Sequence, residues 1–287
     1  AGILVPGDPG VPDGIAPTYR KSVMPRVGIA YDPSGDGQTV IRAGFAMFYD
    51  LLLNGVGGPL RVATQSLPWV TIRQASGANV SFSQPLGPGG FTTADFGQPM
   101  NIFTLESNLR PPYAQDWNLS IERNLGINKL DLRYVGTKGT RLPRFVEANP
   151  AVYGPGATAA NAGRRRIYSK CPADTSKPCD LGFAGVVTGS TNSTYHGVQA
   201  ALSRRFQNGL SYNASYTFSK LLDYVSSLHI AGPAPILVSG EMDLAQNPFD
   251  LNAEHGPSLF DSRHRLTVST LYDLPALALG PRGLRAM

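Results

Sequence analysis

Four side chains in the C-terminal third of the chain are of types that bind metal ions: Glu254, His255, Asp261 and His264. A zinc site takes about four ligands in a fixed geometry. His264 begins a run of alternating residues and His255 lies in a segment without periodicity, so nothing in the sequence fixes their approach. We therefore expect no metal site, and we expect Asp261 to pair with Arg263 or Arg265 instead.

Serine, histidine and aspartate all occur, but their spacing matches no hydrolase pattern. The chain lacks the G-x-S-x-G motif that places a nucleophilic serine on a sharp turn. The glycine-rich residues 87–90 lack the Lys-Ser/Thr pair and the helix of a phosphate-binding loop. An enzyme would also need perturbed titratable groups gathered in one cleft. We therefore expect no enzymatic activity, no catalytic residue and no cofactor.

The chain has two cysteines, Cys171 and Cys179, which lie close together in a polar segment. A zinc site of the CxxC type would need closer pairs and more ligands. We expect a local disulfide, which implies an oxidising compartment. Free thiols are the alternative.

The net charge of +5 raises the question of an anionic partner such as nucleic acid. The basic residues are scattered in short groups along the chain: Arg20-Lys21, Arg164-Arg165-Arg166, Arg204-Arg205, and Arg263 with Arg265. Nucleic-acid binding would need them clustered on one element. The charged fraction of 16% is low against a usual share of about a quarter. We therefore expect no nucleic-acid partner.

The elements that would position any site are β-strands. In residues 195–220, apolar or aromatic side chains alternate with small or polar ones on both sides of a turn at residues 207–209. A period of two residues indicates a strand with two different faces. The same alternation predicts about seven strands: residues 26–32, 39–50, 113–123 and 130–135, the pair within 195–220, and 265–273.

The connections between these strands alternate between short and long. Three short turns lie at residues 33–37, 124–128 and 207–209, and three long loops at 51–112, 136–194 and 221–262. Loops of that length are uncommon inside compact soluble domains. Short turns on one side and long loops on the other are typical of transmembrane β-barrels. The sequence therefore predicts an all-β, antiparallel, up-and-down transmembrane barrel segment with long extracellular loops.

One face of these strands carries polar side chains in mid-strand, where a lipid-facing charge would be costly. Eight of them are candidates to face the barrel lumen: Arg42, Asp116, Asn118, Glu122, Asp131, Arg133, Gln199 and Asn213. They could contact a substrate, pack against a plug or simply hydrate the lumen.

Aromatic residues gather toward the two ends of the predicted strands. Those toward the long loops are Phe45, Tyr49, Tyr113, Trp117, Tyr134 and Phe218, and those toward the short turns are Tyr212 and Tyr272. We interpret them as two interfacial girdles, although aromatic residues favour strands in general.

The odd number of predicted strands indicates that the barrel is incomplete. Bacterial single-chain barrels have even strand numbers, and an open sheet edge cannot sit in hydrocarbon. The chain also begins at Ala1 rather than Met. We expect residues 1–287 to form one partial barrel domain, an arc cut from a longer protein.

Seven segments of the chain carry motifs in a recognisable order. The opening hairpin begins with PRVGIAYDP at residues 25–33. The others, in order, are residues 35–44, 48–50, 117–123, 134–140, 195–220 and 260–266. Each motif alone is weak, but in this order across nearly the whole chain they resemble Oar-like TonB-dependent outer-membrane receptors of the acidobacterial type.

The resemblance implies a plugged transporter barrel, a size class of about 22 strands. It also implies an N-terminal regulatory-like sandwich, a plug and a TonB-box, none of which we recognise in these residues. We expect an outer-membrane protein that contacts lipid, captures a saccharide or peptide ligand with its loops, and couples to the TonB system through the absent N-terminal part. The alternative is a secreted or surface β-rich adhesin or carbohydrate-binding protein without transport.

Overall fold

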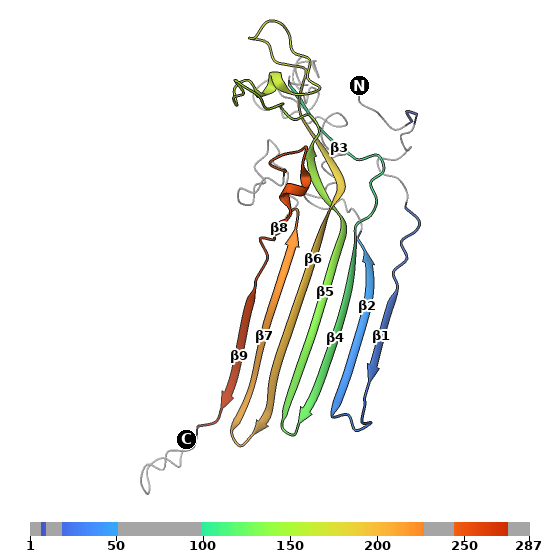
Figure 1. The fold of residues 1–287 in the computed structure, drawn as a ribbon, viewed down its shortest axis with the longest axis vertical. Coiled ribbons are helices and arrows are strands. Elements are labelled where there is room, and N and C mark those ends of the chain that lie inside the picture. The colour runs from blue at the N-terminus through green and yellow to red at the C-terminus, as the bar shows by residue number, and fades with distance from the viewer. Residues whose placement is uncertain (1–6, 10–18, 51–98, 227–243, 275–287) are drawn as a thin grey trace, which may run out of the picture.

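The computed structural model of the chain describes residues 7–9, 19–50, 99–226 and 244–274 (Figure 1). Most of the first expected loop, including the glycine-rich residues 87–90, lies outside these ranges, as does the centre of the third. The statements below concern the described residues.

All strands belong to one sheet of nine. Their bounds are β1 (Arg26–Tyr31), β2 (Thr39–Tyr49), β3 (Met100–Leu105), β4 (Tyr113–Leu125), β5 (Asn128–Glu147), β6 (Leu181–Gln207), β7 (Leu210–Asp223), β8 (Gly256–Pro257) and β9 (His264–Tyr272). The seven long strands run antiparallel in the order β1-β2-β4-β5-β6-β7-β9. Figure 1 shows them side by side, with the three short turns at one end of the sheet.

The sheet has one apolar and one polar face because the pairing register places apolar residues opposite apolar ones and polar residues opposite polar ones. Ile41 lies opposite Ile121, which lies opposite Leu132. One residue further along β2, Arg42 lies opposite Ser120. We call the side that carries Ile41 the apolar face and the side that carries Arg42 the polar face. A register slip of one residue would exchange the two faces, so this match confirms the predicted antiparallel, all-β architecture.

Two of the short turns are held by residues that suit tight connections. The Asp32 carboxylate accepts hydrogen bonds from the backbone N–H groups of Ser34, Gly35 and Gly37. Asn208 and Gly209 both have positive φ, 55° and 74°. Positive φ at both central residues is the requirement of the two-residue hairpin that matches strand twist.

The predicted loop at residues 136–194 is wrong over much of its length. β5 continues to Glu147 and β6 begins at Leu181, so both strands extend well past the alternating segment. Register shifts flank Leu142, and Arg141 has a positive φ of 58°. The alternation stops there because backbone pairing persists while the bulges turn the side chains to new surroundings.

Two further strands lie in segments that we expected to be loops. β3 pairs with β6 in parallel, and the two-residue β8 pairs with the end of β7. Neither carries an alternating pattern long enough to stand out. The structure also has two short 3-10 helices, η2 (Ala162–Arg165) and η3 (Leu251–Glu254). No helix in the described part of the chain is long and apolar enough to cross a membrane.

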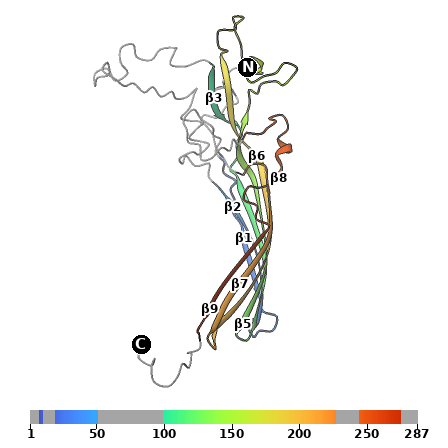
Figure 2. The same ribbon diagram turned by 90° about the vertical axis from the view of Figure 1, so that its left-hand side faces the viewer.

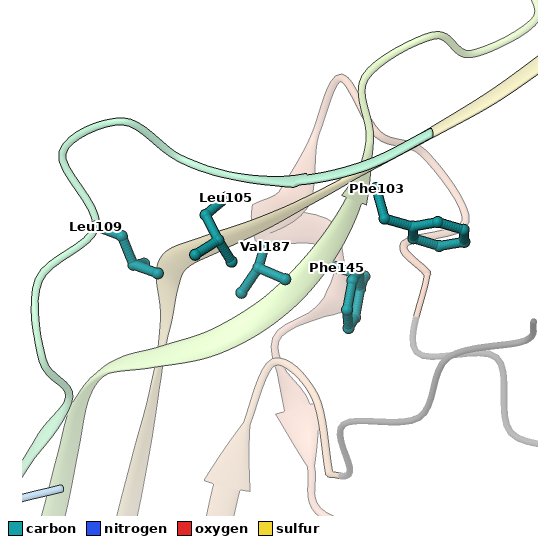
Figure 3. Close-up of a cluster of buried hydrophobic side chains, with 5 residues drawn as sticks. All are labelled: Phe103, Leu105, Leu109, Phe145 and Val187. Atoms are coloured by element: carbon teal, nitrogen blue, oxygen red, sulfur yellow. The ribbon is translucent and has the colours of Figure 1, made fainter. Parts of the chain in front are cut away.

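The extended part of the sheet forms what we call the loop-side module, residues 99–109 and 142–189. Its core is Phe103 and Leu105 of β3, Leu109, Phe145 of β5 and Val187 of β6 (Figure 3). The Phe103 and Phe145 rings meet edge to face at 6.5 Å between centroids. Figure 2 shows β3 beside β6 beyond the end of the main sheet. The long strands below have no comparable buried cluster among the described residues.

Over the described residues, the sheet does not close into a barrel. β1 and β9 are its two outer strands, and every residue of both is exposed. The structure is therefore an arc of antiparallel strands.

Candidate functional site

The polar face carries one continuous row of hydrogen-bonding side chains across six strands. The row consists of Arg42, Ser120, Arg133, Gln199, Thr217 and Arg265, each opposite the next. A second row contains Glu122 beside Asp131, and a third contains Asn118 beside Gly44. Asp116 lies opposite Ala46, and Asn213 opposite Ser203. The register thus brings all eight predicted residues to one face.

Two carboxylates of this face, those of Glu122 and Asp131, have cationic neighbours. Glu122 accepts from Arg42 at 2.5 Å and from Lys129 at 2.8 Å, which links three strands. Asp131 pairs with Arg133 on its own strand at 3.4 Å. The cationic partners are nearly half exposed, so such pairs add little stability. Their consequence is a surface that stays charged, hydrated and open to contact.

The centre of the polar face is slightly hollowed. A shallow depression of about 310 Å³ lies over β5, β6, β7 and β9, and its polar lining is Asp131, Arg133, Gln199, Ser215, Thr217, Arg265 and Thr267. Guanidinium, carboxylate, amide and hydroxyl groups together can bond to hydroxyl-rich or peptide groups. Arg265, Thr217 and Lys129 were missing from the predicted candidates, and the alternation of their strands could have identified them.

His264, one of the four residues of metal-binding type, lies among aromatic side chains. The His264 ring lies against Tyr216, whose hydroxyl is 2.8 Å from Nδ1, and its centroid is 5.2 Å from that of Phe218. Within the described ranges, no group of three or more histidine, cysteine or acidic residues is close enough to hold a metal ion.

Asp261 ties the third loop to the end of β7. Its Oδ1 accepts the backbone N–H of Leu221 at 2.7 Å, and its Oδ2 accepts Arg263 Nε at 3.1 Å. The Leu221 hydrogen bond chiefly lowers the pKa of this carboxyl, and Arg263 lowers it further. Of the two expected partners, Arg263 makes the contact.

The apolar face carries a cluster at its loop-side border that sequence reasoning did not identify. The Trp117 indole covers Gly136, where a Cβ atom would overlap the ring. Its N–H points to the Tyr134 hydroxyl at 3.4 Å, and that hydroxyl lies 2.8 Å from His196 Nδ1. The predicted alternation identifies the aromatic residues, but the glycine beneath the indole follows only from the pairing register.

In the loop-side module, the arginines at 164–166 hold the segment between β5 and β6. Arg164 donates to the backbone carbonyls of Pro172, Asp174 and Lys177. All three lie in the loop that the Cys171–Cys179 disulfide closes. The hydroxyl and N–H of Ser176 lower the pKa of Asp174. The basic run therefore serves local folding.

Arg166 and the buried Asn149 fix the base of the same segment. The Asn149 side chain donates to Gly182 O and accepts from the N–H of Tyr168. Arg166 bridges Glu147 and the Asn149 carbonyl. Two tyrosines remain on the outside, Tyr153 at 90% and Tyr168 at 57% exposure.

The comparison with protein families agrees with the architecture. Residues 1–283 match the family model described as outer membrane beta barrel domain. No curated protein matches the chain. Among solved structures, the outer membrane transporter YddB from Escherichia coli is similar with a TM-score of 0.37 and 11% identity, over 69% of this chain and 20% of that one. The chain thus spans about a fifth of that transporter's length, and at this similarity nothing about function follows.

Proposed function

Because the chain belongs to the outer membrane β-barrel domain family and resides in the outer membrane, we propose that it forms part of the wall of a TonB-dependent receptor. In this proposal, the apolar face lies against lipid and the polar face lines the interior. The loops capture a saccharide or peptide ligand, which then passes inward. The resemblance to Oar-like receptors supports the TonB-dependent type.

One observation carries the proposal: the charged row in mid-strand on the polar face. An Arg or Lys at the midplane of a lipid-facing strand costs about 2–4 kcal/mol. Arg42 and Arg133 lie in the interior of β2 and β5, and Arg265, near the start of β9, lies in the same row. Their side therefore needs water or polar protein, and the depression between Arg133 and Arg265 offers a ligand or plug contact.

The open edges of the arc are the second support. In hydrocarbon, each unpaired backbone N–H or C=O costs several kcal/mol. β1 and β9 each present such an edge in the described sheet. We propose that further strands pair with both edges and complete a closed barrel around the polar face.

An adhesin without transport remains the second candidate, now as an outer-membrane protein. The observation in its favour is the pair of exposed tyrosines on the loop-side module, Tyr153 and Tyr168. Exposed aromatic rings can stack on sugar or peptide groups without any path through the barrel. Neither candidate includes an enzymatic step or a cofactor.

The test is uptake by the full-length gene product in its native host. Cells would be given fluorescently labelled oligosaccharides and, separately, labelled peptides, with and without a functional TonB protein. We expect the label to reach the periplasm only with TonB, and Arg133→Glu/Arg265→Glu to reduce uptake while surface binding persists. Label that stays on the surface in every strain would contradict transport and favour the adhesin.

A further inference from the structure

The charges of the apolar face follow a simple pattern. Across the seven long strands, up to Thr140 on β5 and Asn192 on β6, the described apolar face has four charged side chains, all basic: Arg123, Arg204, Lys138 and Lys220. Arg123 and Arg204 lie toward the short turns, and the two lysines lie toward the loops. The band between them contains no charge, and no carboxylate occurs on this face.

The two lysines lie around one point of the sheet. Lys220 is opposite His196, and Lys138 is opposite Thr194, the residue two positions before His196 on β6. Both lysines and His196 are exposed. Neither lysine has a carboxylate within 4 Å among the described residues. The charge of Lys220 slightly lowers the pKa of Asp261, but that carboxylate already accepts hydrogen bonds from the Leu221 N–H and from Arg263.

The aromatic cluster engages one ring nitrogen of His196 and leaves the other free to contact a ligand. The Trp117 indole N–H can only donate, so the Tyr134 hydroxyl accepts from it. The same hydroxyl lies 2.8 Å from His196 Nδ1, and which of the two atoms donates depends on the tautomer of the ring. When the hydroxyl donates to Nδ1, Nε2 of the neutral ring carries the hydrogen and is a donor beside the two ammonium groups.

We propose that Lys138, Lys220 and His196 bind the phosphate group of an outer-leaflet lipid. The uncharged band beneath them suits acyl chains. On β7, the eight steps from Tyr212 to Lys220 span about 26 Å along the strand. With strands tilted by roughly 40°, this is about 20 Å along the membrane normal, so Lys220 lies near the outer border of the roughly 25 Å apolar band, close to headgroup level. Charge-assisted hydrogen bonds to phosphate are the strong ones.

The inference rests on the proposed orientation of the apolar face toward lipid. The full-length gene product, purified in mild detergent, would be titrated with lipid A, a phosphorylated glycolipid, and binding followed by native mass spectrometry. We expect Lys138→Gln/Lys220→Gln to weaken binding roughly tenfold or more. Lys138→Arg/Lys220→Arg keeps both charges and should retain binding, which separates loss of the site from misfolding.

The matched control is Arg123→Gln/Arg204→Gln, which removes two cations from the opposite border of the same face. Dephosphorylated lipid A should bind as weakly as phosphorylated lipid A binds the double glutamine variant. Millimolar inorganic phosphate should not displace the lipid if the headgroup in its membrane setting is the ligand. Equal losses in both double variants, equal binding of dephosphorylated lipid, or displacement by inorganic phosphate would each overturn the proposal.

Failure of the proposed function would look different. If alkaline carbonate without detergent released the wild-type protein from membranes, the assignment of the apolar face to lipid would be wrong. If the protein stayed in the membrane but bound lipid A equally well without Lys138 and Lys220, only the proposed phosphate site would be wrong.

Discussion

The long strands and the loop-side module place their apolar side chains in opposite ways. On the arc, the hydrophobic side chains are turned outward, as with Leu132 at 43% exposure. In the module, Phe145 and Val187 are 2% and 0% exposed and pack against each other's strands. β5 carries both Leu132 and Phe145, so one strand changes its surroundings along its length. The difference indicates that the strand leaves an apolar solvent and enters an aqueous one.

The bulges around Leu142 lie at this change. On the short-turn side of the bulges, apolar and polar side chains alternate between the two faces without interruption. In our proposal this is because one face contacts lipid and the other contacts water. On the loop side of the bulges, the chain builds a core of the kind found in soluble proteins. Changes on either side of the bulges should therefore affect one region and spare the other.

The largest expected effect is on the module. Phe145→Ala removes the aromatic side chain that Phe103 meets edge to face, which costs about 3–5 kcal/mol in a packed core. Amide hydrogen exchange on the full-length protein in detergent should show faster exchange over β3 and residues 142–189 and unchanged exchange in β7. Equal loss of protection in β7 would mean that the two regions are not independent.

A change on the arc should do the reverse. Leu132→Arg puts a charge in the middle of the apolar face, at a cost of about 2–4 kcal/mol in a bilayer. Urea unfolding in lipid vesicles, followed by tryptophan fluorescence, should show the loss. The control is Gln199→Arg on the polar face, which should change stability little. Comparable destabilisation by the two arginines would contradict the difference between the faces.

Within the module, the disulfide should act locally. Cys171→Ser/Cys179→Ser opens a loop closed over a sequence separation of 8 residues, worth about 2–3 kcal/mol in the chain-entropy model. We expect faster proteolysis between residues 165 and 180 and an intact Phe103–Phe145 core. The carbonyl contacts of Arg164 span the same segment, so Arg164→Ala in addition should speed cleavage further.

The smallest expected effect is a pH dependence of the contact between Asp261 and the Leu221 N–H near the end of β7. The pKa of Asp261 is held below the ordinary 3.8, chiefly by the Leu221 N–H, so its contact is fully present above that pH and is lost as pH falls through the lowered pKa. The protection of the Leu221 amide, its exchange rate compared with the intrinsic rate at the same pH, should therefore fall under acid conditions. In Asp261→Asn the protection should be lower at neutral pH and should not show this loss in acid. A wild-type amide with the same protection at both pH values would argue against the contact.

How much the sequence predicts follows the same division. The arc was predictable because two solvents impose a period of two, and the seven long strands lie where that period indicates. The eight polar candidates also share one face, because register preserves parity between strands. The Trp117 position over Gly136 was not predictable, since it depends on a cross-strand neighbour.

The module was not predictable for a physical reason. Its strands bury side chains according to local packing, and β3 pairs in parallel with β6, which lies far along the chain. The sequence suggested that Arg164 is a solvated charge, because its partners are backbone carbonyls. Every residue has a backbone carbonyl, so residue types do not reveal such contacts. Only the closeness of the two cysteines indicated that this segment is folded.

The central claim is that adjacent residues of β5 face different solvents, and two labels test it most directly. Leu132→Cys and Arg133→Cys, made separately in the full-length protein, would each carry a fluorophore in lipid vesicles, since the native Cys171 and Cys179 are joined to each other. We expect the label at position 132 to be quenched by spin-labelled acyl chains and the label at position 133 by aqueous iodide. The same quencher acting on both, or the reverse pattern, would contradict the account.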